Sequence, residues 1–296
     1  MTQARNKRGA VLCVGRVYCD LIFSGAPRLP SMGTEVYAEG LELHAGGGAF
    51  ITAAHLAALG RRSGLAACLP GAPFADAVRG DIRAAGIDTS LCALAPSGVD
   101  PQVTVVIAGQ GDRAFLTRRT GPALPPLDIG DLIRSGAGHL HIGELATLAE
   151  HPGIVAAART AGMTISLDCG WDETLDGSDL ARLIAAVDIF LPNRSEAEHL
   201  SAAGLPERPA PLTVVKCGAD GARALWADGS ASAPAQAAVP VDTTGAGDAF
   251  NAGFLDAWLS GSPVPICLAA GNAAGARAIE RCGGFSPLPE DAEAAV

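Results

Sequence analysis

The chain predicts an α/β fold with a doubly wound, mostly parallel sheet between helices, and three observations lead to this prediction. Short apolar runs of strand length alternate with longer, alanine-rich runs along most of the 296 residues. The short runs are apolar at nearly every position, as expected of strands that are covered on both faces. Glycine ends several of the longer runs, as it commonly ends helices. Regular alternation of this kind indicates βαβ units.

The individual elements follow from these runs. Core strands are expected at Ala10–Gly15, Leu65–Leu69, His139–Ile142, Thr164–Asp168, Ile189–Leu191 and Leu212–Lys216. Helices are expected at Ala49–Leu59, Phe74–Ala85, Ile154–Ala161, Leu180–Ala186, Ser195–Ala203 and Ala249–Leu259. The whole chain, residues 1–296, is expected to form a single domain.

Two β-rich segments interrupt the alternation, at about 16–45 and 98–120. The first holds no clear helix and contains Glu35–Leu43 with rough polar and apolar alternation. The second predicts a hairpin of Val103–Ala108 and Ala114–Thr117. We assign both segments to a small lid sheet over the carboxyl edge of the core, where open α/β sheets bind ligands. Strands with free edges pair readily, so a homodimer through Glu35–Leu43 or Val103–Ala108 is one hypothesis.

Composition excludes several classes of partner. The formal net charge is −10, whereas a protein that binds nucleic acid needs a basic face. No apolar run is long enough to span a bilayer, so no membrane partner is expected. The basic start, Met1–Arg8, precedes only a short apolar run, which argues against a signal peptide and for a cytoplasmic protein. The eight cysteines include no C-x-x-C pair and are expected to be buried thiols.

The strongest functional signal is the segment Val241–Phe250. Its turn of Gly245, Ala246 and Gly247 opens a helix-like run, and backbone N–H groups at such a point suit developing negative charge. Asp248 lies inside the turn, where its carboxylate could take a proton from a nucleophile. An anion site beside a base is what phosphoryl transfer needs. On these residues alone, a helix-capping aspartate is an equally good interpretation.

Weaker signals lie elsewhere. Gly46, Gly47 and Gly48 run into the first helix, and Asp20 follows the first strand, where a carboxylate could bind sugar hydroxyls. Each is also explained as an ordinary turn residue.

Two further motifs follow predicted strands. Asn193 and Glu196 have the spacing of a capping box, or of a polar pair that orders hydrated Mg²⁺. Lys216, Gly218 and Gly221 predict a tight turn that could pass under a nucleotide.

Taken together, these motifs resemble the PfkB/ribokinase family of carbohydrate kinases over nearly the whole chain. The first family signature, a glycine-rich helix entry that ends in Leu-Gly, is similar to Gly46–Gly60. The second, Asp-Thr-x-Gly-Ala-Gly-Asp-x-Phe, matches Asp242–Phe250 completely. Asn193 and Glu196, and the turn of Gly218 and Gly221, match motifs between them. The resemblance implies a ribokinase-like fold, ATP and Mg²⁺.

The resemblance also implies individual roles. Asp248 would deprotonate the acceptor hydroxyl, and Gly245, Ala246 and Gly247 would form the anion hole for the γ-phosphoryl group. Glu196 and Asn193 would organise Mg²⁺ through water. The nucleotide site would include Asn193, Lys216, Gly218, Gly221, Thr244 and Asn272, and the sugar site Asp20, Gly46, Gly47 and Glu144. In some members Asp242 and Thr244 occupy positions that help form a monovalent-cation site, which leaves K⁺ open here.

Two departures bear on the acceptor. Tyr18 and Ile51 stand where ribokinases carry asparagine, so two amides that could pair with hydroxyls are lost. This argues against ribose itself. Tyr18 offers a flat face for a sugar ring or a nucleobase. Three arginines, Arg113, Arg118 and Arg119, would favour an anionic acceptor if they cover the site, or are simply exposed charges at the lid edge.

The sequence therefore predicts an ATP-dependent kinase that phosphorylates a hydroxymethyl group of a sugar or sugar-like alcohol. A nucleoside kinase of the same family is the main alternative, because Tyr18 and Ile51 make a less polar pocket. An inactive sugar or nucleotide sensor is a third interpretation, against which the complete glycine turn and Asp248 argue. A dinucleotide-dependent oxidoreductase is excluded because Gly15–Asp20 lacks the required G-x-G-x-x-G.

Overall fold

The structure is a computed structural model that describes residues 9–96, 98–99, 101–109, 112–170 and 177–285. Its core is an eight-stranded sheet in the order β14-β13-β12-β11-β10-β9-β1-β4. Six of these strands are parallel, and β13 and β14 complete one edge as an antiparallel hairpin. The bounds are β1 Ala10–Val14, β4 Ser63–Ala66, β9 Ala137–Ile142, β10 Thr164–Asp168, β11 Ile189–Leu191, β12 Leu212–Lys216, β13 Ala222–Trp226 and β14 Gly229–Ala233. The predicted parallel core is confirmed.

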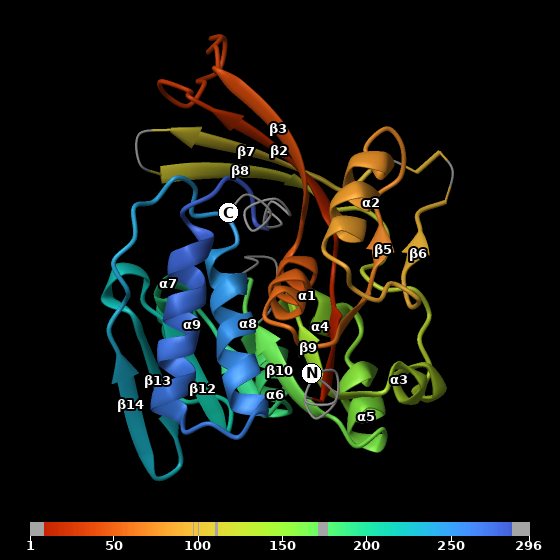
Figure 1. Cartoon of the computed structure of the whole chain (residues 1–296), viewed down its shortest axis with the longest axis vertical. Coiled ribbons are helices and arrows are strands. Elements are labelled where there is room, and N and C mark those ends of the chain that lie inside the picture. Colours follow the sequence, from red (N-terminus) through yellow and green to blue (C-terminus); the bar gives the residue numbers. More distant parts are fainter. Residues whose placement is uncertain (1–8, 97, 100, 110–111, 171–176, 286–296) are drawn as a thin grey trace, which may run out of the picture.

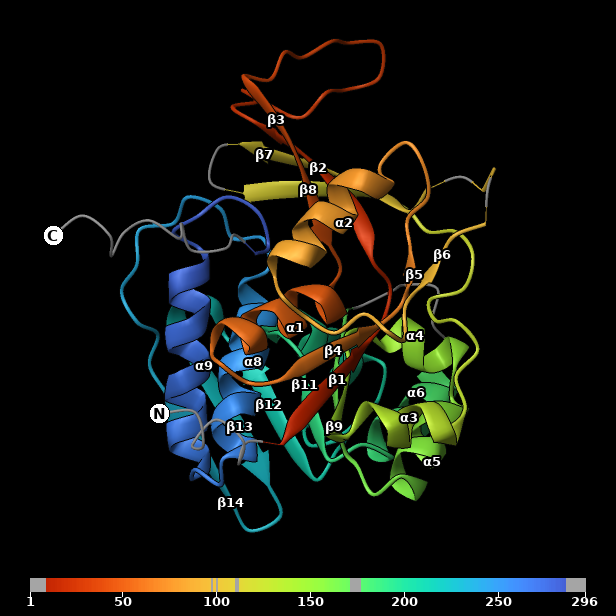
Figure 2. The ribbon, with the colours of Figure 1, turned by 45° about the vertical axis from the view of Figure 1, so that its right-hand side comes forward.

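Helices cover both faces of this sheet (Figure 1). The first face carries α1 Gly48–Ala58, α8 Ala246–Leu259 and α9 Val264–Ala278, with α2 Ala75–Ala84 near the lid. The second face carries α3 Ile129–Ser135, α4 Leu145–Glu150, α5 Gly153–Thr160, α6 Gly177–Ala185 and α7 Arg194–Ala202. Figure 2 shows α8 and α9 on one side of the strands and α3, α5 and α6 on the other. None of the helices in the described part of the chain has the length and apolar character to cross a bilayer.

Strand β1 shows why its run is apolar throughout. Val11 and Cys13 pack in the cluster under α1, whereas Leu12 and Val14 pack in the cluster under α3–α5. Successive side chains of a strand point to opposite faces, so a strand between two helix layers has no polar face.

A second sheet, which we call the lid sheet, lies over the carboxyl ends of the core strands (Figure 1). Its order is β3-β2-β7-β8, with β2 Tyr18–Ser24, β3 Gly40–Gly46, β7 Val103–Gly109 and β8 Asp112–Arg118. The two β-rich segments of the sequence therefore form one sheet. A short pair, β5 Cys68–Leu69 and β6 Ala93–Leu94, lies beside it.

Several expectations need correction. The predicted strand Leu65–Leu69 is divided into β4 and β5, and the hairpin β13–β14, the short helices α3 and α4, and α9 were not predicted. The strand at Val103–Ala108 lies between β2 and β8, so it has no free edge for a dimer. Of the two segments predicted for a dimer, the one around Glu35–Leu43 contributes to β3, which is an outer strand of the lid sheet and could pair with a second copy.

Candidate active site

A cleft of about 1060 Å³ lies between the carboxyl edge of the core sheet and the start of α8. Residues from strands, turns and helices that are far apart in the sequence line it. Among them are Gly48, Glu144, Asp168, Asn193, Glu196, Lys216, Gly218, Thr243, Gly245, Ala246, Gly247, Asp248 and Asn272. Most residues predicted for phosphoryl transfer and nucleotide binding thus meet in one cavity.

The glycine turn at the start of α8 forms the floor of this cleft. Gly245 is the N-cap residue and has φ 73°, a left-handed conformation that favours glycine. A Cβ atom on Gly245 would also lie 2.6 Å from the Cα atom of Gly284, so the turn and the C-terminal segment are in close contact. The first N–H groups of a helix have no acceptor within it and point outward. The turn can therefore receive negative charge from the cleft.

Asp248 is the third residue of α8, and its carboxylate faces the start of α1. A Cβ atom on Gly48 would lie only 2.8 Å from Oδ1 of Asp248. Burial raises the pKa of Asp248 above the usual carboxyl range, and the negative charge of Asp168 raises it further, while Lys216 opposes both effects. A carboxylate with a raised pKa is a stronger base, which suits proton removal from an alcohol.

A buried triad supports this region, and sequence reasoning predicted only one of its members, Lys216, and missed Asp168 and Asn251. Nζ of Lys216 donates to both carboxylate oxygens of Asp168, at 2.8 and 3.0 Å, and to Oδ1 of Asn251 at 3.3 Å. Nδ2 of Asn251 donates to Asp168 at 2.6 Å. Nζ of Lys216 also lies against the glycine turn, because a Cβ atom on Gly247 would be 3.3 Å from it. The ammonium group is thus held beside the predicted anion hole. Asp168 ends a predicted strand, and that position was the available signal.

Asp20 lies in strand β2 of the lid sheet and is not among the residues that line the cleft. It is 8% exposed, and Gly46 leaves room for it, since a Cβ atom there would lie 2.1 Å from its Oδ2 atom. Burial raises the pKa of Asp20 to about 7, against a hydrogen bond from Thr104 and the charge of His44, which lower it. The charge of Asp20 also contributes to the raised pKa of Asp248, so the two carboxylates face the same region.

The remaining predicted acceptor residues have different surroundings. Glu144 lines the cleft, and half-buried Tyr18 lies near it, because burial and then the charge of Glu144 raise the pKa of Tyr18. Ile51 is 4% exposed, and a Cβ atom on Gly284 would lie 2.4 Å from its Cδ1 atom. It therefore packs under the C-terminal segment and does not line the cleft. Gly47 has φ 101° and caps α1.

Asn193 and Glu196 form the capping box that was the alternative to a metal role. Oδ1 of Asn193 accepts from the N–H of Glu196 at 2.9 Å, and Oε2 of Glu196 accepts from the N–H of Asn193 at 2.7 Å. Both residues still line the cleft. Among the described residues no group of three or more His, Cys, Asp or Glu could hold a metal ion alone.

The donors nevertheless fit Mg²⁺ that keeps most of its water. Asp168, Glu196 and Asp248 bring three carboxylates to the cleft against the ammonium of Lys216, and the charges of Asp168 and Glu196 raise the pKa of Asp248. Nucleotide phosphates would add further negative charge, which a hard divalent cation offsets. Mg²⁺ is usually held by one or two carboxylates together with phosphates and water.

Of the other predicted nucleotide residues, Asn272 lines the cleft and Thr244 does not. Thr244 is buried and donates its hydroxyl to Oδ1 of Asp242 at 2.7 Å; its neighbour Thr243 lines the cleft instead. Oδ2 of Asp242 accepts from the N–H of Gly283 at 2.9 Å, which fastens the turn to the C-terminal segment. Asn272 lines the cleft while donating to the carbonyl oxygens of Ala233, which ends β14, and Pro234, which follows it.

Gly218 lines the cleft, whereas Gly221 lies behind it. A Cβ atom on Gly221 would lie 2.1 Å from the carbonyl oxygen of Ala233, so this glycine allows close packing of the β12–β13 turn.

Of the three lid arginines named above, the structure describes the side chains of two. Arg118 and Arg119 are exposed near the end of β8, and the side chain of Arg113 lies outside what the structure describes. The positive charge of Arg119 lowers the pKa of both Tyr18 and Glu144. The charge of Arg119 therefore reaches two of the residues predicted for the acceptor site.

The chain is similar to known proteins over nearly its whole length. Residues 9–291 match the family model described as pfkB family carbohydrate kinase. The chain is 31% identical over 297 residues to an ATP-dependent ribose-1-phosphate kinase of Halopiger xanaduensis, covering 96% of this chain and 97% of that one. A fructokinase of Rhizobium leguminosarum bv. trifolii is 27% identical, with 83% and 78% covered. The crystal structure of the Methanocaldococcus jannaschii nucleoside kinase superposes with a TM-score of 0.79 at 22% identity, over 95% of each chain, which shows the shared ribokinase-like fold.

Proposed function

The chain belongs to the pfkB family of carbohydrate kinases, and from this premise we propose that it transfers the γ-phosphoryl group of ATP to a hydroxymethyl group of a sugar or sugar-like alcohol. The observation that carries the proposal is the pairing of a base with an anion site. Asp248 lies in the first turn of α8, directly after the glycine turn, and Nζ of Lys216 lies against the same turn. Proton removal and charge stabilisation can therefore act on one reacting group.

In this proposal Asp248 removes the proton from the acceptor hydroxyl as its oxygen attacks the γ-phosphorus atom. The bond from phosphorus to the β,γ-bridging oxygen breaks, and ADP leaves. The N–H groups of Gly245, Ala246 and Gly247, with the ammonium group of Lys216, stabilise the charge on the transferring group. Asp168 and Asn251 keep that ammonium group in place.

Mg²⁺ supplies charge neutralisation of the phosphates when it is bound, and Glu196 and Asn193 would hold it through water. A monovalent cation such as K⁺ would have Asp242 and Thr244 as neighbours. The oxygen Oδ1 of Asp242 already accepts two hydrogen bonds from Thr244, so the cation would share that carboxylate. Comparing turnover in potassium and in choline salts tests this role.

The similarity to a ribose-1-phosphate kinase over 96% of this chain makes ribose 1-phosphate the first acceptor to test. Ribose 1-phosphate and a nucleoside share the 5-hydroxymethyl group of ribose and differ at the anomeric carbon, which carries a phosphate or a base. The positive charge of Arg119 at the acceptor end favours the phosphate. The aromatic ring of Tyr18 favours the base, which keeps nucleosides as the second candidate.

The experiment is a measurement of ADP release and product mass with MgATP and a panel of acceptors. The panel contains ribose, ribose 1-phosphate, fructose, 2-keto-3-deoxygluconate and several nucleosides. Strong turnover with a sugar or sugar phosphate supports the proposal, and turnover with nucleosides alone selects the second candidate. ATP binding without transfer to any of these acceptors would favour the sensor interpretation.

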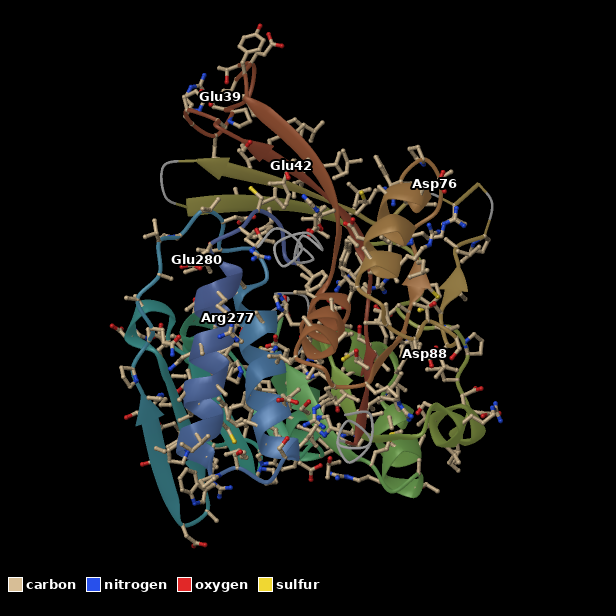
Figure 3. All side chains as sticks on the ribbon, in the orientation of Figure 1. Glu39, Glu42, Asp76, Asp88, Arg277 and Glu280 are labelled. Carbon is tan, nitrogen blue, oxygen red and sulfur yellow. The ribbon has the colours of Figure 1, made fainter. Side chains whose placement is uncertain are left out.

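We also propose that two copies associate through the lid sheet. The outer strand β3 has a free edge, and Leu41, Leu43 and Leu116 on the outer strands β3 and β8 are exposed. Figure 3 shows Glu39 and Glu42 projecting from the same part of the lid, where their charges would restrict the ways in which two copies can pair.

A further inference from the structure

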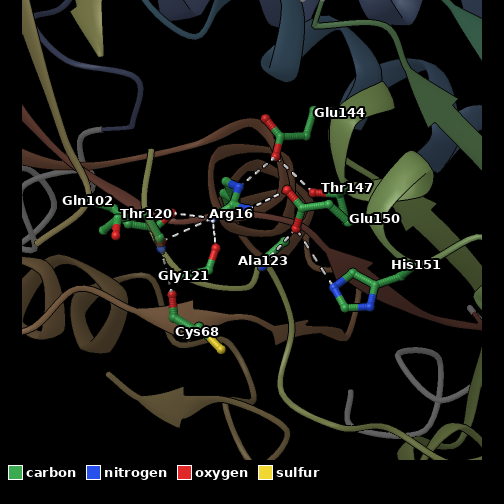
Figure 4. Close-up of polar contacts among 10 residues, drawn as sticks. All are labelled: Arg16, Cys68, Gln102, Thr120, Gly121, Ala123, Glu144, Thr147, Glu150 and His151. Carbon is green, nitrogen blue, oxygen red and sulfur yellow. Dashed lines mark hydrogen bonds and ion pairs between the residues drawn. The ribbon is translucent and has the colours of Figure 1, made fainter. Parts of the chain in front are cut away.

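Arg16 is a buried cation between the core and the lid sheet. Its side chain is 3% exposed, and it follows β1 by two residues. Nη1 donates to Oε1 of Gln102 at 2.7 Å and to the carbonyl oxygens of Thr120 and Gly121 at 3.3 and 2.8 Å. Nη2 donates to Oε1 of Glu150, as Figure 4 shows. One guanidinium group therefore joins several separate segments.

Apart from Glu150, which ends α4, these segments are places where the chain passes between the core and the lid sheet. Arg16 lies in the passage from β1 to β2, Gln102 directly precedes β7, and Thr120 and Gly121 follow β8. The remaining passage, from β3 to α1, touches the main chain of Arg16, because a Cβ atom on Gly47 would lie 2.2 Å from its carbonyl oxygen. All four passages meet at this residue, and its side chain joins the passages before β7 and after β8 to the passage from β1 to β2.

The same side chain points toward the acceptor end of the cleft. Nε of Arg16 is buried without a hydrogen-bond partner, and it lies 3.9 Å from Oε1 of Glu144. Oε1 of Glu144 accepts a hydrogen bond from the hydroxyl of Thr147 at 2.8 Å. A short rotation of either side chain would bring Nε and Glu144 into hydrogen-bond distance. A buried N–H group without a partner is unfavourable, so this bond should form when the two groups approach.

We propose that Arg16 is a positioning residue that links Glu144 in the acceptor site to the placement of the lid sheet. Binding of the acceptor to Glu144 brings the carboxylate and Nε together, and the guanidinium group then holds Gln102, Thr120 and Gly121 in one arrangement. The lid sheet is thereby seated on the acceptor, and water is excluded from the γ-phosphoryl group. This inference rests on the proposed kinase function and on Glu144 as an acceptor residue.

A purely structural role for Arg16 predicts a different outcome, and the chain offers a matched control. Arg61 is equally buried, at 1% exposure, and donates to Asp256, to the carbonyl of Gly9 and to Ser260. These partners lie outside the cleft. Arg61→Lys should lower stability and leave the acceptor KM and the coupling of ATP use to transfer unchanged.

The test compares wild type, Arg16→Lys and Arg61→Lys. Lysine keeps the charge but cannot bond Glu144, Glu150 and the lid carbonyls together. For Arg16→Lys we expect an acceptor KM about tenfold higher, with little change in the KM for MgATP, since only acceptor contacts are disturbed. We also expect more than one ADP released per acceptor phosphorylated, because water then competes and ATP is hydrolysed to ADP and phosphate. Isothermal calorimetry should show weaker acceptor binding without nucleotide.

The inference is overturned if Arg16→Lys behaves like Arg61→Lys, or if both KM values rise together while coupling stays complete. If Arg16→Lys does not fold, Gln102→Leu is used instead, because it removes one lid contact of Arg16 and keeps the ion pair of Arg16 with Glu150. Gln102→Leu should raise the acceptor KM and the ADP released per acceptor phosphorylated. Unchanged values of both would overturn the inference. A wild-type protein that binds MgATP but phosphorylates no sugar removes the proposed function and this inference with it. Wild-type transfer with unchanged Arg16→Lys coupling removes only the inference.

Discussion

The position of Asp248 depends on the missing side chain of Gly48, and Gly48→Ala tests this directly. A Cβ atom on Gly48 would lie 2.8 Å from Oδ1 of Asp248 and 2.8 Å from the carbonyl oxygen of Gly143. Ordinary van der Waals contacts begin at 3.4 Å, so each neighbour is about 0.6 Å too close. The neighbouring atom of Gly143 is a backbone carbonyl oxygen, whereas Oδ1 of Asp248 is the end of a side chain, so the carboxylate of Asp248 is the group that can move.

The expected effect on turnover follows from this displacement. A misplacement of about 1 Å at a reacting group can reduce a rate about 100-fold, so a shift of about 0.6 Å should reduce kcat at least tenfold. The same overpacking should lower the free energy of unfolding by about 1–3 kcal/mol. MgATP binding should be unchanged, because the residues of the nucleotide side are not touched.

Gly153→Ala is the matched control. Gly153 is the first residue of α5, as Gly48 is the first residue of α1, and a Cβ atom there would meet nothing within 4 Å. The assay is steady-state kinetics with the acceptor found in the panel, beside urea unfolding and calorimetric titration with MgATP. Full turnover by Gly48→Ala would refute the reasoning that Asp248 acts as the base from its position in the structure.

Three further predictions concern the charges of the site and the lid. Asp248→Asn should reduce kcat by about 100-fold or more and spare MgATP binding. In the wild type the rate should rise with pH through the raised pKa of Asp248, and Lys216→Met should move that rise to higher pH because the charge of Lys216 lowers this pKa. An unmoved pH profile would contradict the effect of Lys216 on Asp248. Burial raises the pKa of Asp20 from 3.8 to about 7, so the folded state binds this proton more tightly and stability falls as pH rises between those values. Asp20→Asn should remove that fall. At pH 8 its free energy of unfolding should exceed that of the wild type by at most about 4 kcal/mol, at about 1.36 kcal/mol per pKa unit. Equal midpoints of urea unfolding for the two proteins at pH 8 would contradict this prediction. Light scattering at micromolar concentration should show a dimer that Leu41→Glu dissociates, and a wild-type monomer would rule the lid interface out.

Local sequence patterns were sufficient for the core strands. The runs at Thr164–Asp168, Ile189–Leu191 and Leu212–Lys216 became β10, β11 and β12 with the predicted bounds. A strand between two helix layers is apolar on both faces, and this signal lies within a few residues of chain. The short helix α3, in which Ile129 and Ile133 are exposed, and the small-residue hairpin β13–β14 carry no such signal, so they were not predicted.

The same distinction holds for the site. The glycine turn and Asp248 could be predicted because a helix N-terminus, a flexible turn and a carboxylate occur within four consecutive residues. Their chemistry depends on backbone geometry that the local sequence dictates.

Other features depend on which segments the topology brings together. Asp168, Lys216 and Asn251 are separated by dozens of residues, and their contact exists because β10, β12 and α8 meet at one edge of the sheet. The burial that raises the pKa of Asp20 likewise depends on Gly46 and Thr104 from neighbouring lid strands. The sequence by itself determined the fold class and the glycine turn before α8, since both rest on local periodicity and backbone conformation. Only the tertiary structure decided the buried triad and the convergence of the lid passages on Arg16, because side-chain contacts between distant segments follow from the path of the chain.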